Sequence, residues 1–248
     1  MNYTLHNKEL PIPSFFQVYN FGGGFGDKSR EIVYAELTSD TPALVNYFYI
    51  NNEYNYQFHS NLFDKASDFN SVGDLYNHVR DSLIKSGEIY SGYKSKTYDF
   101  NSKVFLLDSG AANIVKQVAC DINYDVDKLK SELIKELRNY YDFADKLKFD
   151  IVVGFDLGGK YTEKDGNNDV EIKKFLSQID TDEINDFLTE ETFKYLSQKK
   201  NFYPYVLATV HGATQNDYAD CVKNILCLES KYKHKFWGFA LGVLGVVV

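Results

Sequence analysis

The sequence lacks the features that mark secreted, membrane-spanning and zinc-binding proteins. Its three cysteines, Cys120, Cys221 and Cys227, form no CxxC pair, which argues against a disulfide framework or a zinc cluster. No basic region followed by an apolar stretch opens the sequence, so we expect no secretory signal. The one long apolar stretch, Phe236 to Val248, is shorter than the roughly 20 residues of a membrane span. We therefore expect a cytoplasmic protein without membrane contact and without a bound metal.

Two features of nucleotide- and nucleic-acid-binding proteins are also missing. The glycine-rich run at residues 21–26 lacks the Lys-Ser/Thr ending of a phosphate-binding loop, and we interpret it as a flexible turn. The chain has 27 basic and 35 acidic residues, a net charge of −8. Because phosphate neutralisation supplies much of the affinity for nucleic acids, this balance argues against a large nucleic-acid footprint within these residues.

What is present is a regular alternation of strands and helices. Hydrophobic residues make up 44% of the chain and charged residues 25%, which is enough for a packed core. Continuously apolar runs predict strands near residues 43–50, 103–108, 149–156, 204–211 and 236–242. Amphipathic periodicity predicts helices near residues 71–86, with Ser71 as the cap, and near 127–147, 169–179, 183–198 and 217–231.

Strands that are apolar along their whole length are typical of parallel strands covered on both faces. Doubly wound sheets and (β/α) barrels share this pattern. Three successive strands end in polar residues, which favours a barrel, because its strand ends converge on one mouth. We expect a turn-rich extension over residues 1–40 and, over residues 41–248, a (β/α)8 TIM barrel truncated after about six strands.

Three side chains at strand ends are candidates for chemistry. Asp108 precedes Ser109-Gly110, Asp156 follows a strand, and His211 precedes Gly212. A carboxylate at a strand end can accept the paired N–H donors of a guanine edge, and a neutral imidazole can bond a ligand carbonyl or act as an acid–base group. The structural alternatives are a turn or helix cap for each aspartate and a buried structural role for the histidine.

Four segments together resemble the tRNA-guanine transglycosylase family, which exchanges guanine in nucleic acid for a 7-deazaguanine. The family carries, in order, a DSGGFQ-type segment, an FDE-type aspartate, a QGG or HG turn and a GYAIGG-type strand. This sequence carries similar segments in the same order, within residues 100–245. They are Asp108–Asn113, Phe155–Leu157, Val210–Gly212 and Gly238–Val243.

The resemblance implies roles for individual residues. Asp108 would be the catalytic aspartate that touches the reacting base, and Asp156 would read the guanine or deazaguanine edge. His211 stands where many members place a base-contacting Gln, and Gly242 and Val243 would form a backbone platform at the pocket floor. The other implied substrate-binding residues are Ser109, Gly110, Asn113 and Gly212.

The departures from the family pattern resemble its divergent branch, which includes relatives that modify DNA instead of tRNA. DSGG has become DSGA, Asn113 replaces Gln, and Leu157 replaces the Glu after the second aspartate. The family's nucleophilic aspartate and its Cys/His zinc site would lie beyond Val248. We therefore expect no cofactor in this chain, little base exchange by the chain alone, and a homo- or hetero-oligomer partner that completes the barrel.

The sequence thus supports a leading hypothesis and two alternatives. The first is a pentosyltransferase of the queuosine type, which inserts a 7-deazaguanine into tRNA or DNA. The second is an accessory subunit or inactive fragment that binds the base without catalysis. The third is an unrelated TIM-barrel hydrolase or lyase in which Asp108, Asp156 and His211 form a polar cluster.

Overall fold

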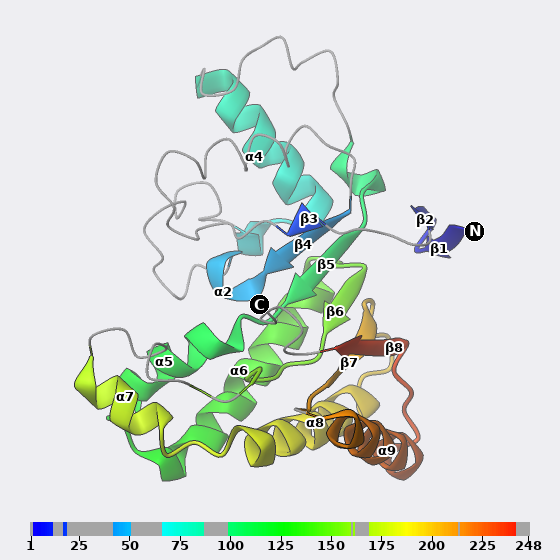
Figure 1. The fold of residues 1–248 in the computed structure, drawn as a ribbon. Coiled ribbons are helices and arrows are strands. Elements are labelled where there is room, and N and C mark those ends of the chain that lie inside the picture. The colour runs from blue at the N-terminus through cyan, green and yellow to red at the C-terminus, as the bar shows by residue number, and fades with distance from the viewer. Residues whose placement is uncertain are drawn as a thin grey trace. The chain divides into compact units, whose positions relative to one another are not determined.

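The computed structural model describes residues 2–11, 17–18, 42–50, 66–86, 99–159, 161, 169–212 and 214–241. The chain divides into two compact units, and Figure 1 labels their helices and strands. Unit 1 comprises Met1–Asp108 and Phe143–Val152, and unit 2 comprises Ser109–Asp142 and Val153–Val248. The predicted boundary at residue 40 and the glycine-rich run at 21–26 lie outside the described residues.

Unit 1 contains parallel strands that pair in the order of the sequence. They are β3 (Gln17–Val18), β4 (Ala43–Asn46), β5 (Phe105–Asp108) and β6 (Ile151–Val153). The helical elements between β4 and β5 are α2 (Tyr47–Ile50), η2 (Ala66–Asp68), α4 (Val72–Ser86) and η4 (Phe100–Ser102). The register places Asn46 beside Asp108 at the carboxyl ends of β4 and β5.

An antiparallel hairpin precedes these strands in unit 1. It pairs β1 (Asn2–Leu5) with β2 (Lys8–Pro11). His6 and Asn7 form its turn with φ angles of 48° and 68°. Positive φ at both turn residues matches the twist of a two-residue hairpin, but His-Asn is not the usual turn sequence, so the sequence analysis did not predict it.

The predicted strand over residues 43–50 is only half correct. Residues Ala43–Asn46 form β4, but Tyr47–Ile50 form the short helix α2. The Asn46 side-chain oxygen accepts a hydrogen bond from the Phe48 N–H at 3.1 Å. This local turn competes with the strand ladder and starts the helix.

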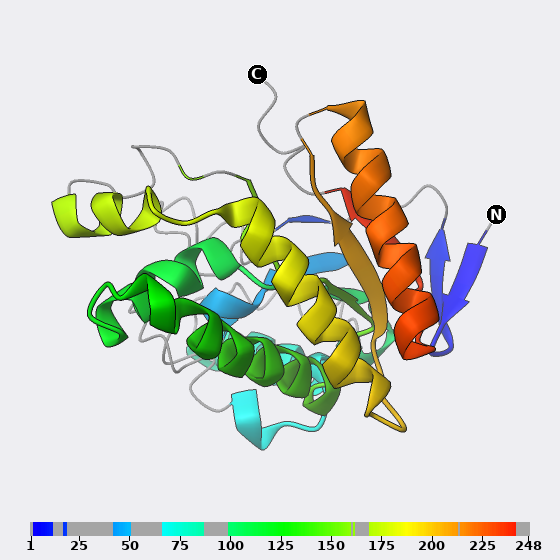
Figure 2. The same ribbon diagram turned by 90° about the horizontal axis from the view of Figure 1, so that it is seen from below.

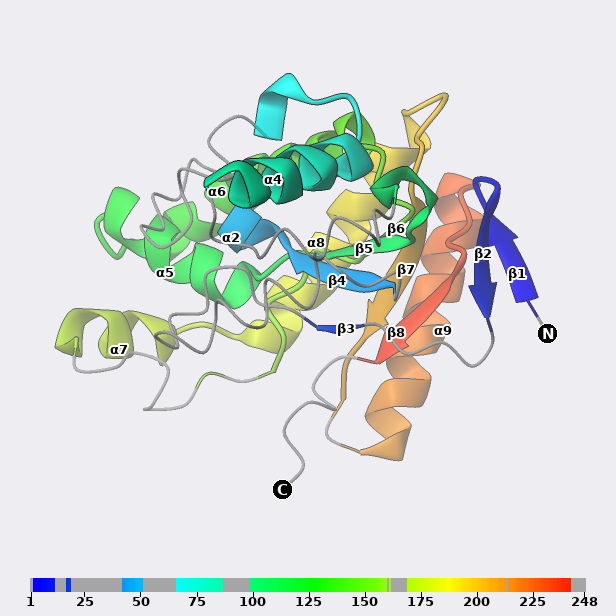
Figure 3. The same ribbon diagram turned by 90° about the horizontal axis from the view of Figure 1, so that it is seen from above.

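Unit 2 carries most of the helices and the strands β7 and β8. In order, its elements are α5 (Ala111–Asp121), α6 (Val126–Lys146), α7 (Val170–Leu176), α8 (Thr181–Ser197), β7 (Tyr205–Val210), α9 (Gln215–Tyr232) and β8 (Gly238–Leu241). Strands β7 and β8 are parallel neighbours, as Figure 3 shows. The last residues of α6 belong to unit 1.

The core of unit 2 lies where α8 and α9 cover one face of β7 (Figure 2). It is built from apolar side chains that alternate along the strand and recur at helical spacing, namely Phe193, Ala208, Val210, Ile225 and Leu228. Phe236, just before β8, stacks on Phe193 with ring centroids 4.2 Å apart. This packing fixes the end of β7, where His211 follows.

The predicted helices all occur, and side-chain caps account for several of their first residues. The Ser71 hydroxyl accepts from Asp74 N–H at 3.0 Å, which confirms the predicted cap of α4. Asp180 accepts from two backbone N–H groups of α8, and Thr214 and Asp217 form a capping box on α9. Helix α5 was not predicted, because residues 109–113 suggested only a turn.

The chain therefore has an α/β fold in which parallel strands alternate with helices, as predicted. The closed (β/α)8 barrel stays a prediction. Among the residues that the structure describes, no helix is long and apolar enough to cross a membrane.

Candidate functional site

The candidate site in unit 2 is built around the segment at residues 154–158, which follows β6. The predicted strand over 149–156 ends already at Val153. The Gly154 N–H still donates to the Leu207 carbonyl of β7 at 2.8 Å. After that, side chains replace the strand ladder, so the segment leaves the sheet while most of its peptide groups remain bonded.

Two adjacent tyrosines of α6 bond the first part of this segment. The Tyr140 hydroxyl donates to the Val153 carbonyl at 2.8 Å, and the Phe155 N–H donates to the Tyr141 hydroxyl at 3.2 Å. Both tyrosines are fully buried. Burial raises the pKa of Tyr141 to about 12, so its phenol stays protonated and neutral beside the site.

Asn185 of α8 bonds the second part. Its side-chain oxygen accepts from the Leu157 N–H at 2.8 Å, and its side-chain nitrogen donates to the Gly158 carbonyl at 2.9 Å. The sequence analysis missed this residue. The sequence does contain one indication of its role. Asn185 is a polar residue among the buried, mostly apolar positions of α8, next to Ile184 and about one turn before Leu188.

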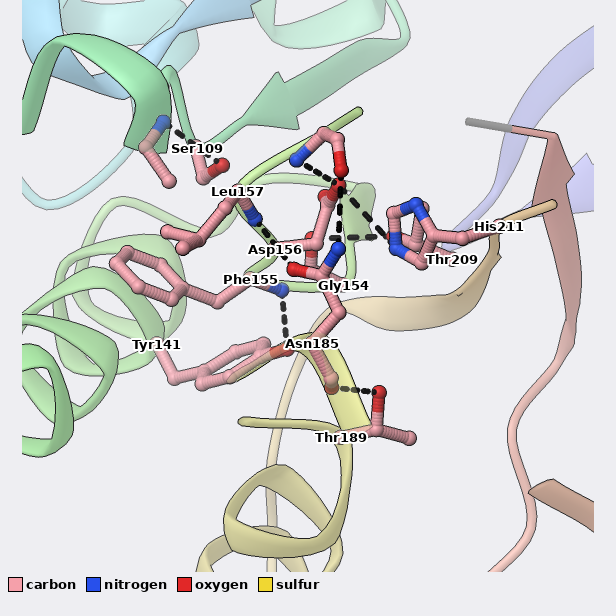
Figure 4. Close-up of polar contacts among 12 residues, drawn as sticks. Ser109, Tyr141, Gly154, Phe155, Asp156, Leu157, Asn185, Thr189, Thr209 and His211 are labelled. Atoms are coloured by element: carbon pink, nitrogen blue, oxygen red, sulfur yellow. Dashed lines mark hydrogen bonds and ion pairs between the residues drawn. The ribbon is translucent and has the colours of Figure 1, made fainter. Parts of the chain in front are cut away.

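Asp156 is held between these clamps with its carboxylate facing β7 (Figure 4). Its Oδ2 accepts from the Gly158 N–H at 2.8 Å and lies 3.4 Å from Nε2 of His211. The side chains of Asp156 and His211 are 13% and 11% exposed. The structure thus brings together two of the three predicted polar residues.

The burial of Asp156 controls its charge. Desolvation raises the pKa of Asp156 to about 6, against the opposing effects of the Gly158 N–H and the Thr209 hydroxyl. The carboxylate is therefore mostly ionised at pH 7, but its neutral form lies within easy reach. Perturbed carboxyl groups of this kind are enriched at functional sites.

His211 contacts Asp156 without forming an ion pair at neutral pH. Desolvation lowers the pKa of His211, while the more distant Asp182 and Asp186 oppose this effect. Both ring nitrogens are buried, and neither has a hydrogen-bond partner among the residues that the structure describes, since the 3.4 Å approach to Asp156 lacks suitable geometry. A neutral imidazole, which carries one donor and one acceptor nitrogen, is thus placed beside an ionisable carboxyl group.

The end of β7 approaches the segment very closely at Gly154. The single hydroxyl proton of Thr209 can serve the Gly154 carbonyl, at 3.2 Å, or the Asp156 carboxylate, whose charged form it then stabilises. A Cβ on Gly154 would lie 2.8 Å from Thr209 Oγ1 and 3.0 Å from Thr209 N. Only glycine permits this approach.

A small cavity lies beside the carboxylate. The cavity has a volume of about 10 Å³ and has room for about one water molecule. Its walls are Gly154, Phe155, Asp156, Thr189, Thr192, Ala208, Thr209 and Phe236. A purine does not fit into this cavity.

The DSG segment begins at the end of β5, where it was expected. In unit 1, Asp108 is partly buried, and its Oδ2 accepts from Asn46 Nδ2 at 3.3 Å. In unit 2, the buried Ser109 hydroxyl accepts from the Ala111 N–H at 3.2 Å, and Gly110 caps α5 with φ 64°. Ser109 and Gly110 therefore both help to start α5.

The remaining predicted site residues are placed as follows. Asn113 lies in the first turn of α5, with its N–H bonded to the Gly110 carbonyl at 2.9 Å. Gly212 packs against the first turn of α9, where an added Cβ would lie 2.8 Å from the Tyr218 nitrogen. Gly242 and Val243 lie outside the described residues. Among the side chains that are described, no group of three or more His, Cys, Asp or Glu residues is arranged to hold a metal ion.

Comparisons of the chain with known protein families, with curated proteins and with solved structures found no match.

Proposed function

We propose that this chain is the substrate-binding portion of an enzyme of the tRNA-guanine transglycosylase kind, which exchanges guanine in tRNA or DNA for a 7-deazaguanine with a nucleophile that these residues do not supply. The proposal includes a (β/α)8 barrel, a more specific architecture than the α/β fold described above. Asp156 recognises the base, His211 contacts the base carbonyl, and Asp108 assists proton transfer. The acceptor nucleotide has to present its base extruded from any stack.

The positions of the four family-like segments support this proposal. Asp108 ends β5, Asp156 follows β6, His211 follows β7, and Gly238–Leu241 form β8. Carboxyl ends of parallel strands are where α/β proteins place their ligand sites.

The observation that carries the proposal is the state of the Asp156 carboxylate. It is mostly desolvated and ionised at pH 7, and its donors within the described part of the chain are neutral, namely the Gly158 N–H and the Thr209 hydroxyl. A guanine edge offers two adjacent N–H donors, and charge-assisted bonds to them are roughly twice as strong as neutral ones. Because the cavity holds about one water, the base would contact the exposed side of Asp156 instead.

One observation also favours a second candidate, a hydrolase or lyase that uses acid–base chemistry. The 3.4 Å approach of Asp156 and His211 joins a carboxyl group of raised pKa to an imidazole of lowered pKa. Such pairs suit proton transfer near neutral pH. This candidate predicts that a variant of Asp156 loses turnover but keeps its affinity for substrate.

Calorimetric titration with guanine and with 7-deazaguanine tests the first candidate. In Asp156→Asn, an amide N–H would face a base N–H, at a cost of about 2–4 kcal/mol. Binding should weaken roughly 30- to 1000-fold. Asp220→Asn is the matched control, because the Asp220 side chain is 70% exposed on α9 and its loss should leave affinity unchanged.

Thermal melting of the three proteins shows whether the fold is retained. Equal affinities of wild type and Asp156→Asn would end the claim that Asp156 reads the base. A large fall in melting temperature for Asp156→Asn would instead assign this carboxylate to the turn at residues 156–158.

A further inference from the structure

We propose that Asn185 is a positioning residue, whose side-chain amide holds the Gly158 N–H on the Asp156 carboxylate. This inference rests on the proposed function only for the statement that the carboxylate meets a base. The geometry itself is independent of any ligand.

The Asn185 side chain bonds two peptide groups of the segment at residues 154–158 and its neighbour. The Leu157 N–H, which Asn185 accepts at 2.8 Å, belongs to the peptide before Leu157. The Gly158 carbonyl, to which Asn185 donates at 2.9 Å, belongs to the peptide after Gly158. Between them lies a single peptide, and its N–H is the one that donates to Asp156 Oδ2 at 2.8 Å. One side chain therefore fixes the planes on both sides of the donor.

The backbone conformation makes such a clamp necessary. Gly158 has φ +75°, in the left-handed region, and apart from its chain neighbours no described atom lies within 4 Å of where its Cβ would be. Packing by the described residues therefore does not hold this position, and glycine itself has many accessible conformations. Without the two Asn185 bonds, the Gly158 N–H would be free to turn away from the carboxylate.

Asn185 is itself rigidly held. Its side chain is 3% exposed on α8, between Ile184 and the buried stripe that continues at Leu188. The backbone carbonyl of Asn185 accepts from the Thr189 hydroxyl at 2.8 Å. A buried amide with both its donor and its acceptor used gives a defined orientation, which a longer or apolar side chain would not supply.

The consequence is measurable at Asp156. The Gly158 N–H favours the charged carboxylate, so losing this bond should raise the pKa of Asp156 above its present value of about 6. Among the described residues, the titratable groups that face the carboxylate are His211, at 3.4 Å, and Tyr141, whose pKa the Asp156 charge helps to raise. Asp182 and Asp186 act on His211 from α8.

The test follows the amide resonance of Gly158 by NMR between pH 4 and 8, without any base present. The side-chain carboxyl ¹³C resonance of Asp156, followed in the same samples, reports the protonation of Asp156 whether or not the Gly158 N–H is bonded to it, so the midpoint is read from that resonance. The Gly158 amide shift shows whether the hydrogen bond to Oδ2 is kept, and Asp156→Asn identifies the signal that belongs to this carboxyl group. We expect the midpoint to rise by about one pH unit in Asn185→Ala, a tenfold change in proton affinity. Asn185→Ser, which is too short to bond both peptides, should raise it as well if the alanine variant does not fold.

Asn224→Ala is the control, since Asn224 makes one exposed contact to Asp186 on the outer side of α8. An unchanged midpoint in folded Asn185→Ala or Asn185→Ser would overturn the inference and leave Asn185 a purely structural residue, visible only in melting temperature. Guanine titration of the same proteins is read separately. If the midpoint moves but wild type binds no guanine, the proposed function fails and the positioning role stands.

Discussion

Asp150 and Asp156 are two buried aspartates on either side of β6, and their surroundings differ sharply. In unit 1, Asp150 precedes the strand and is fully buried. Its Oδ2 accepts from Lys8 Nζ at 2.8 Å and from the Phe105 N–H at 2.9 Å. In unit 2, Asp156 follows the strand, and the donors that reach it from the described residues are neutral.

Burial raises the pKa of both carboxyl groups, and at Asp150 the Lys8 ammonium opposes the effect. The hairpin cation thus fixes the charge of Asp150 in a structural contact. Among the described residues no lysine or arginine pairs with Asp156, so this carboxylate can accept hydrogen bonds from a ligand. The presence of a cationic partner, more than burial, therefore distinguishes the two carboxyl groups.

Removing Lys8 should give the largest effect on stability. In Lys8→Met, the Asp150 carboxylate would lose its buried cation, and breaking such a pair typically costs about 3–5 kcal/mol of unfolding free energy. Urea unfolding at pH 7 measures the loss. The control is Lys223→Met, which removes a pair on the surface of α9 and should change little. Similar losses in both variants would show that Asp150 does not depend on Lys8.

The second prediction concerns pH and Asp156. Its folded-state pKa of about 6 lies above the unfolded value of about 3.9. The folded state therefore binds this proton more tightly, and stability should rise as pH falls from about 6 to about 4. The gain should be roughly 2–3 kcal/mol.

Urea unfolding of wild type and Asp156→Asn across this range isolates the effect, because Asp150 is present in both proteins. The wild type should gain stability on acidification relative to the variant. Parallel stability curves would mean that Asp156 keeps an ordinary pKa, and the contrast with Asp150 would disappear.

The smallest effect is expected at two glycines beside Asp156. In Gly154→Ala, the new Cβ would clash with Thr209, and overpacking of this kind costs about 1–3 kcal/mol. In Gly158→Ala there is space, but the positive φ should cost about 1 kcal/mol. Thermal unfolding ranks the two variants. If Gly154→Ala lost less stability than Gly158→Ala, the close approach of β7 to Gly154 would not be what stabilises the segment around Asp156.

The sequence predicted much of the fold because its helices are amphipathic and its strands continuously apolar. It placed Asp156 and His211 near strand ends, and the structure brings them within 3.4 Å. It could not predict Asn185, because the clamp joins side chain and backbone from distant parts of the chain. Helix α5 could not be predicted, because Ser109 and Gly110 are equally typical of a turn and of a helix start. Their capping role depends on the helix that follows.

The short helix α2 has a consequence for the aggregation tendency of the newly synthesised chain. The run Ala43–Ile50 is aromatic and aliphatic except for Asn46, a composition that readily forms intermolecular cross-β contacts. The folded protein limits this hazard by ending the strand at Asn46 and burying Tyr47, Phe48 and Ile50. A chain still emerging from the ribosome exposes the whole run. Chaperones should therefore encounter this segment in an aggregation-prone form before the protein has folded. We expect the polar amide of Asn46 to limit aggregation, because it interrupts the apolar run.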